Sequence, residues 1–138
     1  MNEIALDYLN NITSQMIFIN SLLGGFSLTV VASLLDSPIK TSLGNKLFKT
    51  AIVATSSFLV SIFAMTKILM ITTKGYPLEF EQNDLIFPRV VGMLSSFLGI
   101  ISLTLMISIS GWIRSKRIGI FTSIVGITSL LLIFLMLF

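Results

Sequence analysis

The chain has 138 residues, of which 54% are hydrophobic and 11% are charged, and it contains neither Cys nor His. Soluble domains carry about 25% charged residues, so this chain is too apolar to be soluble and too apolar to be disordered. The missing Cys and His exclude disulfides, zinc clusters, thiol nucleophiles and imidazole bases. The net charge of +3 is too small to predict a nucleic-acid partner.

The first segment, residues 1–15, predicts a short helix that lies in the membrane interface. Its apolar side chains repeat at helical spacing, on a face formed by Ile4, Ala5, Tyr8, Leu9 and Ile12. The opposite face is polar, with Asp7, Asn10, Asn11 and Ser14. The alternative is that this segment is a frayed extension of the first membrane-spanning helix.

Four apolar segments follow, at about residues 16–35, 50–72, 90–112 and 118–138. A hydrocarbon core about 30 Å thick needs about 20 helical residues, because each residue rises about 1.5 Å. Lys67 is the only charged residue inside these segments. Backbone groups in lipid must be bonded internally, which favours helices. The sequence therefore predicts a single all-α transmembrane domain over residues 1–138, a polytopic membrane protein with four transmembrane helices in a bundle.

The first span carries two stripes of small and polar residues. One stripe contains Asn20, Gly24, Ser27 and Val31, and the other contains Ser21, Gly25, Thr29 and Ser33. Two small faces predict two neighbours for this helix, because small side chains let helices approach closely in lipid. The first stripe is our candidate lining of a pore. The alternative is that it only packs the bundle.

Spans two to four each carry small residues at positions i, i+3, i+7 and i+10, which is the seam of a left-handed coil. The seams are Ala54, Ser57, Ser61 and Ala64; Gly92, Ser95, Gly99 and Ser102; and Gly119, Thr122, Gly126 and Ser129. We expect these residues to pack helix against helix.

Lys67 is the candidate charge site. Its aliphatic stem can carry the ammonium group from within the second span to the head-group region. Alternatively, the charge faces a water-filled path or a carboxylate of the next connection, from Glu79, Glu81 or Asp84. A ring of Lys67 side chains around an oligomer axis would favour anions.

The basic residues predict the orientation. Two connections, residues 36–49 and 113–117, lie on one side and hold Lys40, Lys46, Lys49, Arg114, Lys116 and Arg117. The other side has Lys74 and Arg89. The positive-inside rule therefore places the N- and C-termini outside the cytoplasm. The bias toward Ile, Leu, Phe, Asn and Lys suggests an AT-rich microbial genome, so we expect the protein in the cell (inner) membrane of a microbe.

The run Leu22-Leu23-Gly24-Gly25-Phe26, in the first of four spans, resembles the pore helix of Orai-type calcium-channel subunits. The resemblance includes the layout of the four spans and implies a multimer whose first span lines a central pore. The filter glutamate of that family corresponds to Ser33, which cannot supply a ring of carboxylates for Ca²⁺. Orai subunits also keep both termini in the cytoplasm, opposite to the orientation predicted here.

The spans contain no Asp or Glu, and their serines have no His beside them. We therefore expect no enzymatic activity, no cofactor and no metal. The sequence favours an oligomeric channel or pore-forming subunit that conducts small ions, including an effector that permeabilises membranes. The alternative is a non-conducting accessory, assembly or immunity subunit of a larger membrane protein. Both act in the lipid bilayer, and the first is expected to be a homo-oligomer.

The orientation can be tested by cysteine labelling, because the chain has no native Cys. Single cysteines at Ser42, Ser115 and Asn83 are treated with a membrane-impermeant thiol reagent. We expect Asn83→Cys to react in intact cells, and the other two variants to react only after lysis. The reverse pattern would overturn the predicted orientation.

Overall fold

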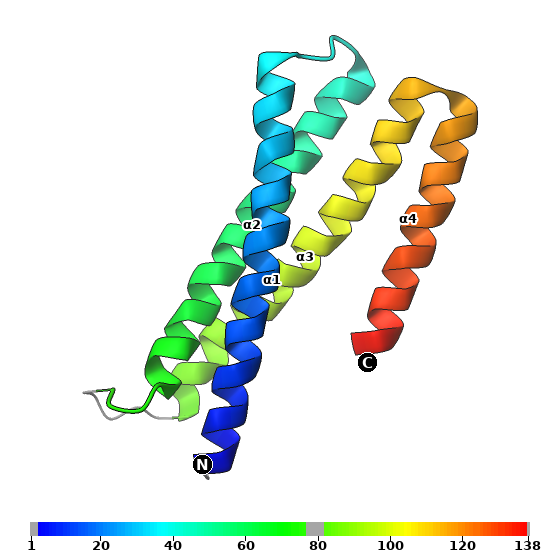
Figure 1. Ribbon diagram of the computed structural model, residues 1–138. Helices are drawn as coiled ribbons and strands as arrows, with labels where there is room; N and C mark the ends of the chain where they lie inside the picture. Colours follow the sequence, from blue (N-terminus) through cyan, green and yellow to red (C-terminus); the bar gives the residue numbers. More distant parts are fainter. Residues whose placement is uncertain (1–2, 77–81, 138) are drawn as a thin grey trace.

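The computed structural model describes residues 3–76 and 82–137, which form four helices and no strand (Figure 1). They are α1 (Glu3–Asp36), α2 (Ser42–Thr72), α3 (Gln82–Arg114) and α4 (Lys116–Leu137). Each helix packs antiparallel against the next in the chain. All four are long enough and apolar enough to cross a membrane. The predicted all-α bundle of four transmembrane helices is confirmed.

The two connections at the same end of the bundle are short and capped. Thr41 precedes α2, and its side chain accepts a hydrogen bond from the Gly44 backbone N–H over 3.0 Å. Ser115 does the same for α4, accepting from the Ile118 N–H over 3.2 Å. These side chains satisfy backbone donors that the first turn of a helix leaves unpaired. Gly44 has no room for a side chain, because a Cβ there would lie 2.3 Å from the Ile39 carbonyl oxygen.

The helices differ in length relative to the membrane. The 34 residues of α1 extend about 51 Å, whereas the 22 residues of α4 extend about 33 Å. A hydrocarbon core is about 30 Å thick, so α4 matches it and α1 exceeds it. The helices α2 and α3 also exceed it, with 31 and 33 residues. The first three helices are therefore longer than the membrane core is thick, and they must tilt or extend beyond it.

The expected separate interfacial helix is not present, because residues 3–15 continue directly into the first span as one helix. Side-chain contacts hold this extension against α2. The Asn10 amide donates to Thr72 Oγ1 over 3.0 Å and also contacts the Leu69 carbonyl oxygen at 3.4 Å. These bonds direct residues 3–15 along the end of α2 instead of across the membrane surface. The segment is thus an extension of the first span, as the alternative prediction had it, but it is a regular helix from Glu3 and is not frayed.

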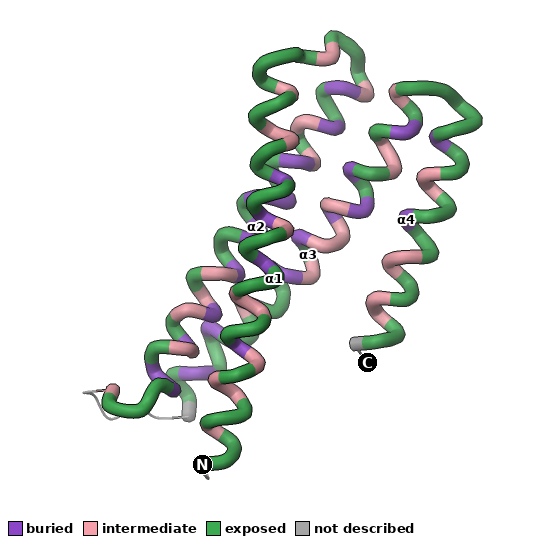
Figure 2. Tube along the Cα trace, viewed as in Figure 1, coloured by how far each residue is buried: buried purple, intermediate pink, exposed green. Residues whose placement is uncertain are grey.

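Figure 2 shows which residues of the bundle are buried and which are exposed. Large apolar side chains dominate the exposed residues, and polar side chains are present among the buried ones. Phe18, Phe63 and Phe121 are exposed to 65%, 73% and 67%. The buried residues among the described side chains of α1 are Thr13, Asn20, Gly24 and Ser27. Such an arrangement would be unfavourable in water but suits lipid, where apolar surface is solvated and polar groups need protein partners. The chain is therefore an integral membrane protein.

Phe58 of α2 is the largest side chain buried completely in the bundle, with no exposed surface. It lies between two glycines of the neighbouring helices. A Cβ added at Gly24 of α1 would be 3.1 Å from the Phe58 Cβ, and one at Gly99 of α3 would be 2.7 Å from its ring. Gly24 and Gly99 thus make the space for this aromatic ring, which fills the centre of the three-helix contact.

Among the described residues, α4 packs mainly on α3, and it stands apart from α1 and α2 (Figure 1). Near its C-terminal end, Phe134 stacks on Phe97 of α3, with ring centroids 5.6 Å apart. Because the two helices run antiparallel, the residues of α3 that precede Phe97 extend beyond the end of α4. This part of α3 faces α1 and α2 without cover from α4.

Replacing Gly99 by Ala tests the packing around Phe58. The new methyl group would meet the aromatic ring below contact distance, so we expect a loss of stability of about 1–3 kcal/mol. Gly25→Ala is the matched control, because no atom lies within 4 Å of a Cβ at that position. Thermal unfolding in detergent compares the two variants. Equal unfolding temperatures would contradict the packing described here.

Candidate functional site

Three helices meet in a chain of hydrogen bonds around Asn20. The Asn20 Nδ2 group donates to Ser61 Oγ of α2 over 2.9 Å, and Ser61 Oγ donates to the Gly92 carbonyl oxygen of α3 over 2.7 Å. Ser96 Oγ of α3 donates to Asn20 Oδ1 over 2.8 Å. Asn20 is 2% exposed and Ser61 is completely buried. In hydrocarbon, where water cannot compete, these bonds fix how α1, α2 and α3 sit against one another.

The rest of the predicted pore-lining stripe also lies inside the bundle. Ser27 is completely buried and its hydroxyl donates to the Leu23 carbonyl oxygen over 2.9 Å. Gly24 faces Phe58, as described above. Val31 is half-buried and packs against a cluster formed by Leu47, Ala51 and Met106.

This placement differs from the predicted pore lining. Within the chain, Asn20, Gly24 and Ser27 are buried and Val31 is half-buried, so these four residues lie on the packing face of α1 and not on its exposed surface. The physical reason is that α2 and α3 supply Ser61 and Ser96, which give the Asn20 amide better partners than water in a narrow pore. The alternative stated for this stripe, that it packs the bundle, describes the contacts.

The second stripe of α1 has the opposite environment. We call Ser21, Gly25, Thr29 and Ser33 the outward stripe, because all four are exposed. Ser21 Oγ donates to the Ile17 carbonyl oxygen and Thr29 Oγ1 to that of Gly25, over 2.7 and 2.9 Å. Gly25 has open space where a side chain would be. No described residue of α2, α3 or α4 covers this face.

The small residues of spans two to four lie between helices. Ala54 and Ser61 are completely buried and Ser57 is 7% exposed, while Gly92 and Gly99 are buried on α3. On α4, Gly119 lies against the Trp112 side chain and Gly126 against Ser108. The Trp112 indole donates to Ser123 Oγ over 3.0 Å, which adds a bond between α3 and α4.

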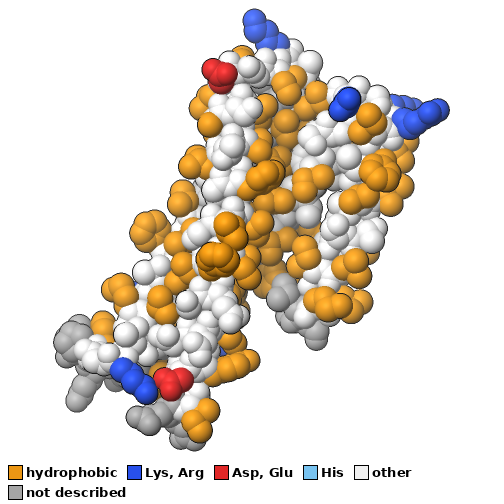
Figure 3. Space-filling view, viewed as in Figure 1, with side chains coloured by type: hydrophobic (Ala, Val, Ile, Leu, Met, Phe, Trp, Pro, Cys, Tyr) orange, Lys and Arg blue, Asp and Glu red, His pale blue; other side chains and the backbone are white. Residues whose placement is uncertain are grey.

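Lys67 is exposed on α2 and does not line the interior of the bundle. Two of its predicted carboxylate partners, Glu79 and Glu81, lie outside the described residues, and Asp84 lies in the first turn of α3. The basic side chains gather mainly at the opposite end, around the two capped connections (Figure 3). Lys67 is thus placed toward the less basic end of the bundle.

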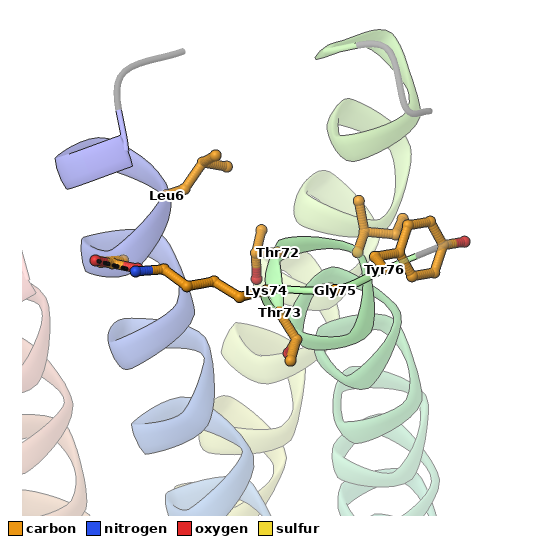
Figure 4. Close-up of a pocket in the computed structure, with 8 residues that line it drawn as sticks. Leu6, Thr72, Thr73, Lys74, Gly75 and Tyr76 are labelled. Atoms are coloured by element: carbon orange, nitrogen blue, oxygen red, sulfur yellow. Dashed lines mark ion pairs between the residues drawn. The ribbon is translucent and has the colours of Figure 1, made fainter. Parts of the chain in front are cut away.

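That less basic end contains a shallow pocket of about 210 Å³ between the first turns of α1 and the end of α2 (Figure 4). Lys74 reaches from the end of α2 toward α1, where its Nζ lies 3.7 Å from Asp7 Oδ2. Both side chains are more than half exposed, so this pair contributes little to stability. Gly75 turns the chain after α2 with a positive φ of 93°.

The sequence indicated some of these residues and missed others. Asn20 needed a partner, because an amide in a span cannot remain unbonded. Ser96 lies one residue beside the predicted seam of the third span, and only the rotation of α3 shows that it faces Asn20. The burial of Phe58, next to Ser57, could not be predicted from the sequence, because most large apolar residues of a span face lipid.

Comparison with protein families, with curated proteins and with solved structures found no match to this chain. The functional assignment therefore depends on the geometry of the chain itself.

Asn20→Leu tests the hydrogen-bonded chain. The variant keeps the approximate side-chain volume but removes the amide nitrogen that bonds Ser61 and the amide oxygen that bonds Ser96. We therefore expect the unfolding free energy to fall by about 1–2 kcal/mol. Ser21→Leu, one residue along on the exposed side, serves as the control and should change stability little. Reversible unfolding in mixed micelles measures both. A loss confined to conduction, with unchanged stability, would contradict the packing role.

Proposed function

We propose that this protein is a subunit of a homo-oligomeric membrane channel that conducts small ions, with the outward stripe of α1 facing the pore. The observation that carries the proposal is that polar and small residues continue along an exposed face of α1. That face is open from Ser21 to Ser33, whereas most exposed surface of the bundle is apolar. A membrane-spanning face of small and hydroxyl side chains is favoured where the helix meets water or another protein, whereas a face that meets only lipid is favoured by large apolar side chains.

The order of side chains on this face supports a gated path. Phe18 lies on the same face about one turn before Ser21 and is 65% exposed. A ring of such aromatic side chains around an axis would form a hydrophobic constriction, which closes a pore by dewetting. Beyond the other end of the stripe, Asp36 is exposed at the last residue of α1. In the oligomer, it would place carboxylates at the mouth of the pore on the basic side.

We place the basic end of the bundle in the cytoplasm of a microbe and the N- and C-termini outside it. The support is the distribution of Lys and Arg, because short loops rich in these residues remain on the cytoplasmic side of the inner membrane. In this orientation Lys67 lies toward the outer leaflet, where its exposed side chain can reach the head groups.

A second candidate function is an accessory or assembly subunit that binds a larger membrane protein through the same face. The observation that favours it is the internal bonding of the Ser21 and Thr29 hydroxyls to their own helix. Such a face can meet an apolar protein surface without losing a hydrogen bond, and Gly25 allows close approach. The two functions differ in whether the purified chain alone conducts.

Cysteine modification in liposomes tests the channel. We expect purified protein to pass small ions without a partner, and a cationic thiol reagent to reduce the flux of Gly25→Cys and Thr29→Cys to the level of protein-free liposomes. Both positions are exposed on the outward stripe. Val60→Cys is the control, because Val60 is exposed on α2 away from this stripe and its modification should leave the flux unchanged.

Phe18→Ser tests for a channel that is closed at rest. The variant removes the proposed constriction and should raise the flux of small ions. If neither the natural chain nor Phe18→Ser conducts, the channel proposal is wrong. Co-purification of the natural chain with a larger membrane protein, lost in Gly25→Leu, would then favour the accessory subunit.

A further inference from the structure

A groove between α1 and α3 lies in the part of the bundle that α4 leaves uncovered. It has a volume of about 260 Å³. Most of its lining is apolar, and it is formed by Ala5, Tyr8, Leu9, Ile12, Thr13, Met16, Met65, Ile68, Arg89 and Met93. The groove is elongated along α1 because its residues there run from Ala5 to Met16, which is about 17 Å of helix.

Arg89 is the only charged side chain among the residues that line this groove. It is exposed, and no ion pair joins it to an acidic side chain in the described part of the chain. The groove lining contains no Asp or Glu, and its one phenol comes from Tyr8. A guanidinium beside apolar walls is complementary to a ligand that has both an anionic group and a hydrocarbon chain.

The depth of Arg89 in the membrane agrees with this chemistry. It lies at the start of the predicted third span, and Lys67 lies within the last two turns of the second, so these two cations mark the same boundary of the hydrocarbon core. Phosphates of one leaflet lie at this level. The groove residues Leu9, Met16 and Met93 surround the space next to Arg89, where an acyl chain of that lipid would lie.

We propose that this groove binds one phospholipid with an anionic head group, whose phosphate contacts Arg89 and whose acyl chain occupies the apolar space between α1 and α3. The absence of a carboxylate from the lining disfavours phosphatidylethanolamine, because its ammonium group would have no partner beside the guanidinium. A phosphatidylglycerol head group has no such charge. The site is independent of the outward stripe and does not require that the protein conducts.

Photolabelling tests the site in nanodiscs of phosphatidylcholine that contain a small fraction of lipid with a photoreactive acyl chain. With a phosphatidylglycerol probe, we expect labelled peptides from residues 5–16 and 89–93, identified by mass spectrometry. A phosphatidylethanolamine probe should label them less. Equal labelling by both probes, or labelling spread evenly over all four helices, would overturn the proposal.

Two variants separate the head-group contact from the acyl-chain contact. Arg89→Gln should lower phosphatidylglycerol labelling of the groove by about fivefold, the factor equivalent to about 1 kcal/mol for one basic residue near the membrane surface. Met93→Trp keeps the charge but fills the groove, and it should lower labelling as well. Unfolding temperatures of both variants verify that the bundle is intact.

Lys67→Gln is the matched control, because Lys67 is a cation near the same membrane boundary but does not line the groove. It should leave the labelling unchanged. Loss of labelling in Lys67→Gln equal to that in Arg89→Gln would show general attraction of charge, and the proposed site would be wrong.

Discussion

The hydrogen bonds of the Asn20 amide determine the arrangement of the first three helices. An amide in hydrocarbon that lacks partners costs several kcal/mol, so α1 must be rotated until both ends of this group are bonded. Ser61 and Ser96 provide those partners, one from each neighbouring helix. Two further consequences follow from this rotation. Gly24 is brought onto Phe58, and the stripe that begins at Ser21 is turned away from the bundle.

The attachment of α4 uses different contacts and has different consequences. Its glycines lie against α3, and Thr122 Oγ1 also approaches the Ser108 carbonyl oxygen at 3.3 Å. These contacts involve one neighbour only. The helix α4 is the shortest of the four, and Phe134, close to its C-terminal end, stacks on Phe97. The beginning of α3 therefore remains open to lipid. The groove beside Arg89 exists because three long helices continue past the end of a shorter one.

Much of this fold could be predicted from the sequence, because the hydropathy of a span is a property of many residues together. The four helices and the small residues between them follow from apolar length and from spacing. Which face of α1 points into the bundle could not be predicted from the sequence, because both stripes of α1 contain small residues and differ mainly in Asn20. That side chain could have lined water or bonded to protein. Asn20 bonds to protein because Ser96 faces it, and the direction of Ser96 is set by the rotation of α3.

The helix ends were harder to predict for a related reason. Residues 3–15 have an apolar face, which suits a membrane surface as well as a neighbouring helix. Asn10 decides between the two, because its amide finds Thr72 at the end of α2. The connection between the end of α2 and the start of α3 is long in sequence, so its length does not predict how the residues of these two helices align. The local periodicity therefore did not fix the position of residues 3–15, which is determined by contacts between segments distant in the sequence.

The two exposed features of α1 occupy different parts of the helix, which bears on how they could act together. The outward stripe covers residues 21–33, whereas the groove uses residues 5–16 and faces α3. No residue belongs to both. Oligomers that close around the outward stripe would leave Arg89 and the groove at their lipid-facing side, next to the end of α4. A lipid bound there would contact α1 just before Phe18, on the same rigid helix as the stripe. Because Asn20 ties that helix to α2 and α3 between the two features, the groove and the outward stripe are held in a fixed relation to each other.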